Sequence, residues 1–135
     1  KTVMATLRDT DALANLHMHG ERYGHGLQEI FREYALPVTL LGTPVRLAVR
    51  WQGVSGVATS QELRTLWLAE QARRGILAGY GAIFPMTCWE ASDVTKLLNV
   101  ADEVCALIAE AVQQQQVRAI MPCSVIYNSS AIRKE

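Results

Sequence analysis

Apolar side chains in the first third of the chain recur with a helical period. The repeat begins after Asp9-Thr10-Asp11, whose short polar side chains can accept hydrogen bonds from free N–H groups at a helix start, and it stops before Pro37. Spacings of three and four, with one step of a single residue, predict an amphipathic helix. The stripe consists of Leu13, Leu16, Gly20, Tyr23, Leu27, Ile30, Phe31 and Tyr34.

Three glycines lie inside this predicted helix. Gly20, Gly24 and Gly26 each cost the helix up to ~1 kcal/mol relative to alanine. One interpretation is a helix that is weakened or broken around residues 24–26. The other is a continuous helix whose small residues let another backbone approach closely.

The pattern changes from helical to alternating after Pro37. Val38–Leu41 is a short apolar run, and Val45–Trp51 alternates as a half-buried strand does. Gly42-Thr43-Pro44 between the two runs has the composition of a turn. We therefore expect an antiparallel hairpin, followed by a surface loop at Gln52–Ala58.

A second helix is predicted to begin after Thr59. Thr59 and Glu62 have the spacing of a capping box, in which each side chain bonds the other residue's backbone N–H. Gly75 ends the helix, after Arg73 and Arg74 have placed positive charge at the negative end of the helix dipole.

The clearest helical pattern begins near Ser92, which is the expected N-cap. Its apolar stripe runs unbroken at i, i+3 and i+4 spacing until the glutamines at 113–116. We expect the central part of this stripe, from Leu98 to Ile108, to be buried against the second strand of the hairpin. The stripe consists of Val94, Leu97, Leu98, Ala101, Val104, Cys105, Ile108 and Val112.

The remaining elements complete the predicted fold. Ile76–Met86 is expected to form one or two short strands, so the order is helix, hairpin, helix, strand pair, helix. This order predicts an α+β fold with helices packed on one face of a small, mostly antiparallel sheet. We assign residues 1–116 to this domain. Residues 117–135 form a tail of unknown role, with Val125-Ile126-Tyr127 as a candidate for an added strand.

Composition and charge narrow the classes of function. The 135-residue chain is half hydrophobic, and 13 Lys and Arg balance 13 Asp and Glu. A zero net charge argues against a dedicated binder of nucleic acid or of an anionic membrane, because both need a basic face. No apolar run approaches the roughly 18–20 residues that span a bilayer, and no signal peptide opens the sequence. Three cysteines without C-x-x-C spacing fit a reducing compartment, so we expect a cytoplasmic protein.

The histidines His17, His19 and His25 raise the question of a metal site. Residues two apart on a helix point to different faces, so His17 and His19 are not expected to chelate one ion. His25 lies about two turns from His17, and no cysteine or carboxylate cluster completes a ligand set. We therefore predict ordinary histidines and no metal.

Glycine-rich and acidic motifs also fail to define a site. The stretches at 24–26 and 79–81 lack the third glycine of a dinucleotide-binding fingerprint and do not sit between a strand and a helix. Asp9 and Asp11 are explained by capping, and Asp102 and Glu103 by a solvated helix face.

The lysines complete the search for catalytic groups. None of Lys1, Lys96 and Lys134 lies in an apolar setting that would lower its pKa for Schiff-base chemistry. We therefore assign no catalytic, cofactor-binding or metal-binding residue to this chain.

Four collinear motifs resemble one enzyme family. The stretch at 63–76, LRTLWLAEQARRGI, is similar to a helix leading into R-R-G-I/V, and residues 19–27, HGERYGHGL, to a G-x-R-L-x-x-G-L helix. Residues 41–47 resemble a G-x-P-x-R hairpin, and residues 91–94 the start of a final helix. The family is the class III, fold type I pyridoxal-phosphate aminotransferases, in the branch that resembles glutamate-1-semialdehyde aminomutase, and the similar part is their C-terminal domain.

The resemblance covers about residues 1–112 and omits the family's active-site groups. It implies that the Schiff-base lysine, the aspartate for the pyridine nitrogen and the phosphate-binding residues lie upstream, in a large domain. Many members carry an arginine near Leu77–Gly79 that grips a substrate carboxylate, and this chain has none there. Trp89 stands where the family has a histidine, so no family residue is transferred to this chain.

The resemblance implies a parent enzyme that transfers an amino group between amino and oxo compounds through pyridoxal phosphate. That enzyme, an aminotransferase or an aminomutase, would be a cytosolic homodimer. This piece would pack against the large cofactor-binding domain, help to close the active site and be inactive alone. The alternative is an independent α+β interaction or ligand-sensing module without catalysis, and a free-standing enzyme of other chemistry is a third hypothesis.

Overall fold

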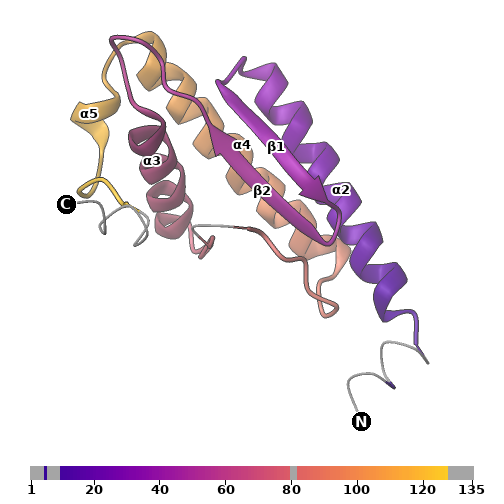
Figure 1. Cartoon of the computed structure of the whole chain (residues 1–135). Coiled ribbons are helices and arrows are strands. Elements are labelled where there is room, and N and C mark those ends of the chain that lie inside the picture. The colour runs from indigo at the N-terminus through magenta and orange to yellow at the C-terminus, as the bar shows by residue number, and fades with distance from the viewer. Residues whose placement is uncertain (1–4, 6–9, 80–81, 128–135) are drawn as a thin grey trace, which may run out of the picture.

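The computed structural model describes residues 5, 10–79 and 82–127. Within them, long helices alternate with one hairpin and an irregular connection (Figure 1). The elements are α2 (Ala12–Glu33), β1 (Val38–Thr43), β2 (Arg46–Trp51), α3 (Ser60–Arg73), α4 (Ala91–Gln113) and α5 (Val117–Ile120).

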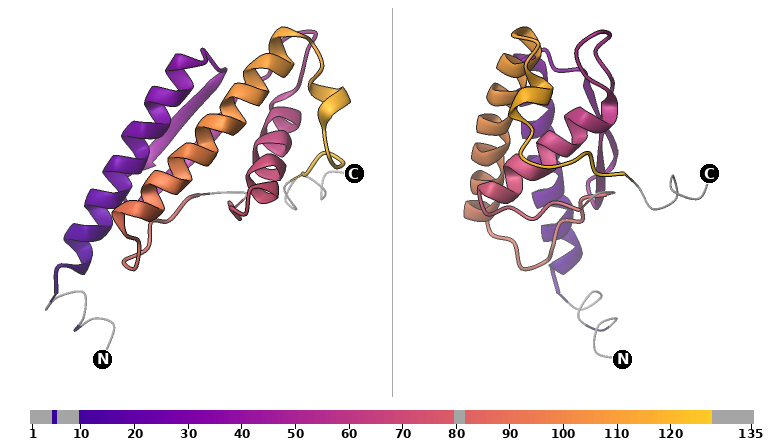
Figure 2. Two further views of the ribbon diagram at one scale, coloured as in Figure 1. Left: turned by 180° about the vertical axis from the view of Figure 1, so that it is seen from behind. Right: turned by 90° about the vertical axis from the view of Figure 1, so that its left-hand side faces the viewer.

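The helices and the hairpin form two layers. Strands β1 and β2 pair antiparallel, and α2, α3 and α4 all lie on one side of them, as the views from behind and from the side show (Figure 2). Helix α2 packs on both strands and on α4, while α3 packs on β2 and α4. The predicted α+β fold, with helices on one face of a small antiparallel sheet, is confirmed.

Helix α2 is continuous through its glycines. The broken-helix interpretation is therefore wrong, and close approach explains the stripe. A Cβ on Gly20 would collide with the backbone carbonyl oxygen of Pro44, in the turn of the hairpin. Gly24 faces the side chain of Leu47, and Gly26 faces that of Leu98. The small residues thus let the hairpin and α4 lie close against the helix.

The hairpin is antiparallel, as predicted, but its turn lies later in the chain than the predicted Gly42-Thr43-Pro44. Its register pairs Val38 with Trp51 and Thr43 with Arg46, so Pro44 and Val45 make the turn. Gly42 lies inside β1 with φ +105° and abuts the Arg46 carbonyl, a conformation that favours glycine.

Helix α3 begins and ends as its sequence predicts. The Thr59 hydroxyl accepts from the Glu62 N–H at 3.2 Å, and the Glu62 carboxylate accepts from the Thr59 N–H at 2.7 Å. At the other end Gly75 has φ +82°, and the Ile76 N–H donates to the Gln71 carbonyl at 2.9 Å. This pair of features is the Schellman ending.

Helix α4 differs from its prediction in two ways. Its N-cap is Glu90, not Ser92, because the Asp93 carboxylate accepts from the Glu90 N–H at 2.8 Å. Its backbone packs on α2, α3 and α5 and not directly on the strands. Accordingly Leu98, over Gly26, is only partly buried, whereas Ile108 is fully buried.

The connection from α3 to α4 is mostly irregular. Ile83 forms an isolated antiparallel bridge with Leu47, with N–H to O distances of 3.0 and 2.6 Å, on the open edge of β2. The strand pair predicted at Ile76–Met86 is thus wrong for its described residues, and positions 80–81 lie outside them.

The segment after α4 packs back on the domain. Val117, in α5, is fully buried, and the guanidinium of Arg118 bonds the Glu62 carboxylate at 2.6 Å. The Ile126 N–H donates to the buried Thr65 hydroxyl at 2.9 Å. Residues 125–127 are not a strand, so that expectation is wrong, and residues 117–127 brace α3 instead.

Candidate functional site

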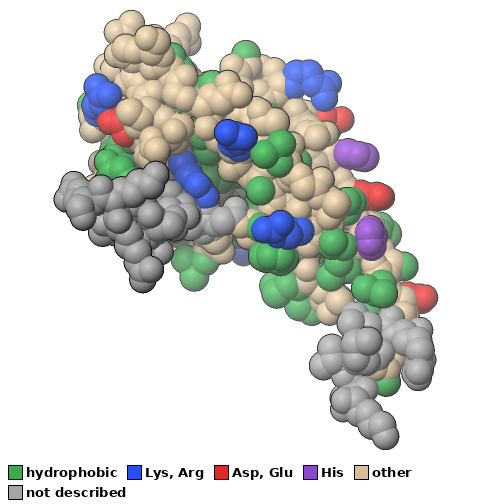
Figure 3. Space-filling model, viewed as in Figure 1, with side chains coloured by type: hydrophobic (Ala, Val, Ile, Leu, Met, Phe, Trp, Pro, Cys, Tyr) green, Lys and Arg blue, Asp and Glu red, His purple; other side chains and the backbone are tan. Residues whose placement is uncertain are grey.

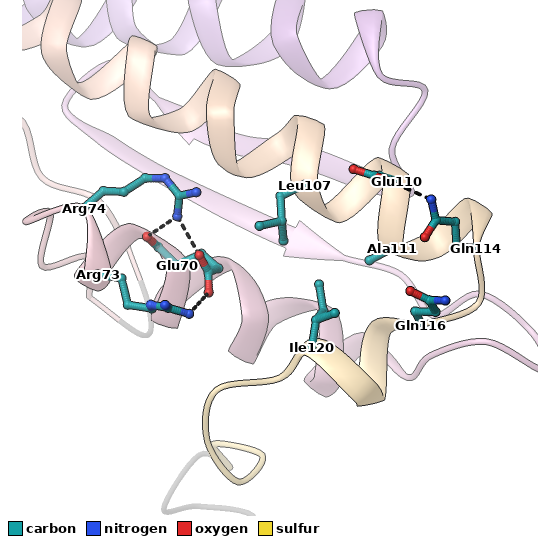
Figure 4. Close-up of a pocket in the computed structure, with 9 residues that line it drawn as sticks. All are labelled: Glu70, Arg73, Arg74, Leu107, Glu110, Ala111, Gln114, Gln116 and Ile120. Carbon is teal, nitrogen blue, oxygen red and sulfur yellow. Dashed lines mark hydrogen bonds and ion pairs between the residues drawn. The ribbon is translucent and has the colours of Figure 1, made fainter.

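A cleft of about 650 Å³ opens between α3, α4 and α5 (Figure 4). The three helices meet there because α5 turns back across the ends of the other two. The walls carry charged groups at one end, amides at the other and an apolar floor between them. The lining residues are Glu70, Arg73, Arg74, Leu107, Glu110, Ala111, Gln114, Gln116 and Ile120.

A buried carboxylate organises the charged end of this cleft. Glu70 is 4% exposed, and its carboxylate accepts from Arg73 Nη1 at 3.1 Å and from Arg74 Nη1 at 2.6 Å. Arg74 also donates from Nε to Glu103 on α4 at 3.0 Å, which ties α3 to α4. The hydrogen bond that Arg74 donates to Glu70 raises the pKa of Arg74. Each of the four charged groups therefore has an opposite charge as a partner within this network.

The other end of the cleft is lined by one carboxylate and two side-chain amides, from Glu110, Gln114 and Gln116. Gln114 Nε2 donates to the Glu110 carboxylate at 2.9 Å, one turn apart on α4. Leu107, Ala111 and Ile120 form the floor between the two ends (Figure 4). The described lining holds no nucleophile beside a general base, so its chemistry suits holding a ligand or a segment and not turning one over.

Sequence reasoning missed the Glu70 cluster, although a signal was present. Arg73 and Arg74 follow Glu70 by three and four residues, which places all three on one helix face. The position of the two arginines at the end of α3 also suits the negative end of the helix dipole, and this simpler role hides the pairing with Glu70. Glu103 belongs to the same network and is not merely part of a solvated face.

The histidines occupy separate positions along α2. His17 and His25 are exposed, and His19 is buried to 7% exposure. Among the described residues, no group of three or more histidine, cysteine or acidic side chains could hold a metal ion.

The acidic residues singled out in the sequence are also dispersed. Asp11 is the N-cap of α2 but makes no side-chain cap hydrogen bond, and Asp9 lies outside the described residues. Asp102 bonds the Tyr34 hydroxyl, and this hydrogen bond raises the pKa of the tyrosine. Within the part that it describes, the structure places none of these acidic residues beside a second one in a catalytic arrangement.

Among the described residues, no lysine or cysteine lines the cleft between α3, α4 and α5. Lys96 is exposed on α4, and Lys1 and Lys134 lie outside the described residues. Cys105 is buried in the core, and desolvation, followed by the charge of Asp102, raises its pKa to about 12. Cys88 and Cys123 are exposed thiols.

Trp89, at the position where the resembling family has histidine, is a packing residue. Its ring meets the Tyr23 ring edge to face, with centroids 6.0 Å apart. Burial raises the pKa of Tyr23, whose side chain is 3% exposed. The aromatic pair fills the space between α2 and the start of α4, so it contributes to the core and not to proton transfer.

No helix in the described part of the chain has the length and apolar character needed to cross a bilayer.

Comparison with known proteins gives matches in fold but not in sequence. No family model matches, and no curated protein matches. A transaminase with pyridoxal phosphate bound superposes with a TM-score of 0.70 at 14% identity, over 82% of this chain and 27% of its own. The FumI protein of Sphingopyxis sp. MTA144, in its pyridoxal-phosphate internal aldimine form, gives 0.68 at 18% identity, over 86% and 27%.

These matches show the fold. The chain folds like the small C-terminal domain of such transaminases. It spans about a quarter of the length of the solved structures that it matches.

Proposed function

We propose that this chain is the C-terminal part of a pyridoxal-phosphate-dependent aminotransferase or aminomutase, of the branch resembling glutamate-1-semialdehyde aminomutase. The observation that carries the proposal is the asymmetric overlap: 82% of this chain matches 27% of a transaminase. The collinear motifs over residues 1–112 support it independently, because they are features of the amino-acid sequence and not of the fold. In this proposal residues 1–116 are the aminotransferase-like part, and the following segment braces α3.

The described residues do not fit pyridoxal phosphate as its binding site. An internal aldimine needs a lysine held in a desolvated or cationic setting, and Lys96 is exposed on α4. The arginines of the cleft are engaged by Glu70 and Glu103. The cofactor, which supplies the electron sink for amino-group transfer, would therefore be held by a larger domain of the same protein. This chain contributes walls and packing.

Exposed apolar side chains between α3 and α4 support a role beside a larger body. Leu77 is 93% exposed, Phe84 60% and Met86 53%, all in the irregular connection. Large apolar side chains gathered in one exposed segment are typical of a surface that another body covers. The larger domain is the partner we propose, in a cytoplasmic homo-oligomer.

The proposal predicts how the isolated chain behaves with the cofactor. After incubation with pyridoxal phosphate and removal of the free cofactor, the purified 135-residue chain should retain no cofactor-derived visible absorbance and should not turn over amino and oxo substrates. Absorbance spectra and borohydride reduction followed by peptide mass spectrometry test this. A stable reduced adduct on one specific lysine of this chain would contradict the proposal.

An independent ligand-sensing module is the second candidate, and the cleft between α3, α4 and α5 favours it. The cleft volume of about 650 Å³ is large enough for a metabolite, and its lining is polar and apolar in the manner of binding sites. The coding sequence distinguishes the two candidates. A large domain encoded upstream of Lys1 supports the enzyme, and a start codon directly before Lys1 supports the module.

A further inference from the structure

One face of the β1–β2 hairpin points away from the helices (Figure 2). Leu47 and Trp51 point toward the helices, so the alternate residues of β2 point outward. The register places Leu41 beside Ala48 and Thr39 beside Arg50 on that outward face. We call this surface the outer hairpin face. It comprises Thr39, Leu41, Arg46, Ala48 and Arg50.

The outer hairpin face combines exposed apolar and cationic side chains. Leu41 is 44% exposed, and Arg46 and Arg50 are both exposed. Viewed from this side, Lys and Arg side chains are interspersed with hydrophobic ones over the strands, whereas Asp and Glu lie toward the margins (Figure 3). The chain as a whole has zero net charge, so this face gathers cations.

The two arginines have no partner within the part of the chain that the structure describes, where the ion pairs of Arg73, Arg74 and Arg118 lie elsewhere. Arg50 lies four positions after Arg46 on β2, about 13 Å along the strand, with Ala48 and its pairing partner Leu41 between the two arginines. The face therefore presents two cations that flank a small apolar patch.

The hollow beside this face extends it toward α3. It has a volume of about 380 Å³ and is lined in part by Leu41, Arg50, Trp51 and Ser60. Trp51 is 5% exposed, and its indole Nε1 has no hydrogen-bond partner among the described residues. The face thus borders a recess as well as a row of side chains.

We infer that the outer hairpin face docks onto a carboxylate-bearing surface of the larger domain, an inference that rests on the function proposed above. About three quarters of each matched transaminase chain has no counterpart here, and a domain of that size is large enough to cover the outer hairpin face. Charge supplies the complement, because burying arginines without carboxylate partners costs several kcal/mol. The Leu47–Ile83 bridge also joins this hairpin to the connection that holds Phe84 and Met86.

Chemical footprinting of the complete protein tests this inference. Phenylglyoxal modifies accessible arginines, and Arg32, exposed on α2, is an internal reference on the other layer. In the native complete protein, Arg46 and Arg50 should react about tenfold more slowly than Arg32, and all three should react equally after denaturation. Equal native rates overturn the inference, whether or not a larger domain exists. Protection that disappears on dilution or after nuclease treatment also overturns it, in favour of a second copy or of nucleic acid.

Charge reversal gives a second readout that does not depend on reagent access. In the complete protein, R46E with R50E should speed proteolytic cleavage at the domain junction about tenfold, because the cleavable open state becomes more populated, and R32E should leave the rate unchanged. The same rate for both variants contradicts docking through this face. Cofactor trapping on a lysine outside this chain remains a separate outcome, so the function and the docking face can fail independently.

Discussion

The two faces of the β1–β2 hairpin differ although alternate residues of the same two six-residue strands form them. Toward the helices, Leu47 and Trp51 are each 5% exposed. The ring centroid of Trp51 lies 6.3 Å from that of Phe31 and 5.9 Å from that of Trp67. On the outer face, Leu41 is 44% exposed and the arginines are unpaired among the described residues.

The comparison shows that one alternating pattern can build a buried apolar face and an exposed cationic face together. A strand's side chains change face at each residue, so a slip of one residue in register would exchange the two sets. The close contact of Gly20 with Pro44 and the positive φ of Gly42, beside the Arg46 carbonyl, favour the observed register. Steric fit against α2 thus determines which side chains face the core. The alternate side chains, including Arg46 and Arg50, are left on the outer face.

The largest expected contrast comes from truncating one leucine of α2, in the core that the hairpin covers, and one leucine of the outer hairpin face. Leu27 is fully buried, so Leu27→Ala should lower the free energy of unfolding by roughly 2–5 kcal/mol. Leu41→Ala, on the outer face, should change it by less than about 0.5 kcal/mol in the isolated chain. Urea denaturation of the two variants measures both values. Equal losses would show that the outer face belongs to the core of this chain.

A second contrast lies within α2 itself. Gly20→Ala places a Cβ against the Pro44 carbonyl and should cost about 1–3 kcal/mol or more, because backbone must move. Gly24→Ala meets the Leu47 side chain at 3.5 Å, an ordinary contact, and gains up to ~1 kcal/mol of helix propensity. Thermal unfolding followed by circular dichroism compares the pair. A neutral Gly20→Ala would contradict the close approach.

The smallest effect concerns charge at the edge of the covered layer. Hydrogen bonding from Arg118, then from Thr59, lowers the pKa of Glu62 to about 2 from its usual 4.5. Because the folded-state pKa is depressed, the stabilisation is complete above pH 4.5 and is lost as the pH falls toward 2. Glu62→Gln should therefore flatten the decline of stability over that pH range, by up to about 1 kcal/mol, since Arg118 is largely exposed. If the free energy of unfolding of Glu62→Gln falls with pH as steeply as that of the unchanged chain, Glu62 does not cause the loss of stability in acid.

Locally encoded elements were the ones that the sequence could predict. The capping box at Thr59 and the glycine end at Gly75 each depend on side chains within a few residues, and both formed. The alternation of β2 likewise predicted which residues face the core. The true cap of α4 was missed because the Asp93 carboxylate bonds the Glu90 N–H just before the serine.

Features that depend on distant partners were missed. Whether Ile76–Met86 forms strands depends on pairing with β2, and only the bridge of Ile83 with Leu47 formed in its described part. The packing of residues 117–127 on α3 depends on the Arg118–Glu62 and Ile126–Thr65 contacts, which join positions some 60 apart. The cleft needs three helices to meet, so no local pattern predicted it.

The location of the cofactor lysine tests the proposed function most directly. The product of the complete coding sequence should be loaded with pyridoxal phosphate, reduced with borohydride and digested for peptide mass spectrometry. Our proposal predicts a single reduced lysine that lies outside the 135 residues of this chain, together with visible absorbance that the chain alone lacks. A reduced lysine at Lys96, or a complete product that traps no cofactor on any lysine, would contradict it.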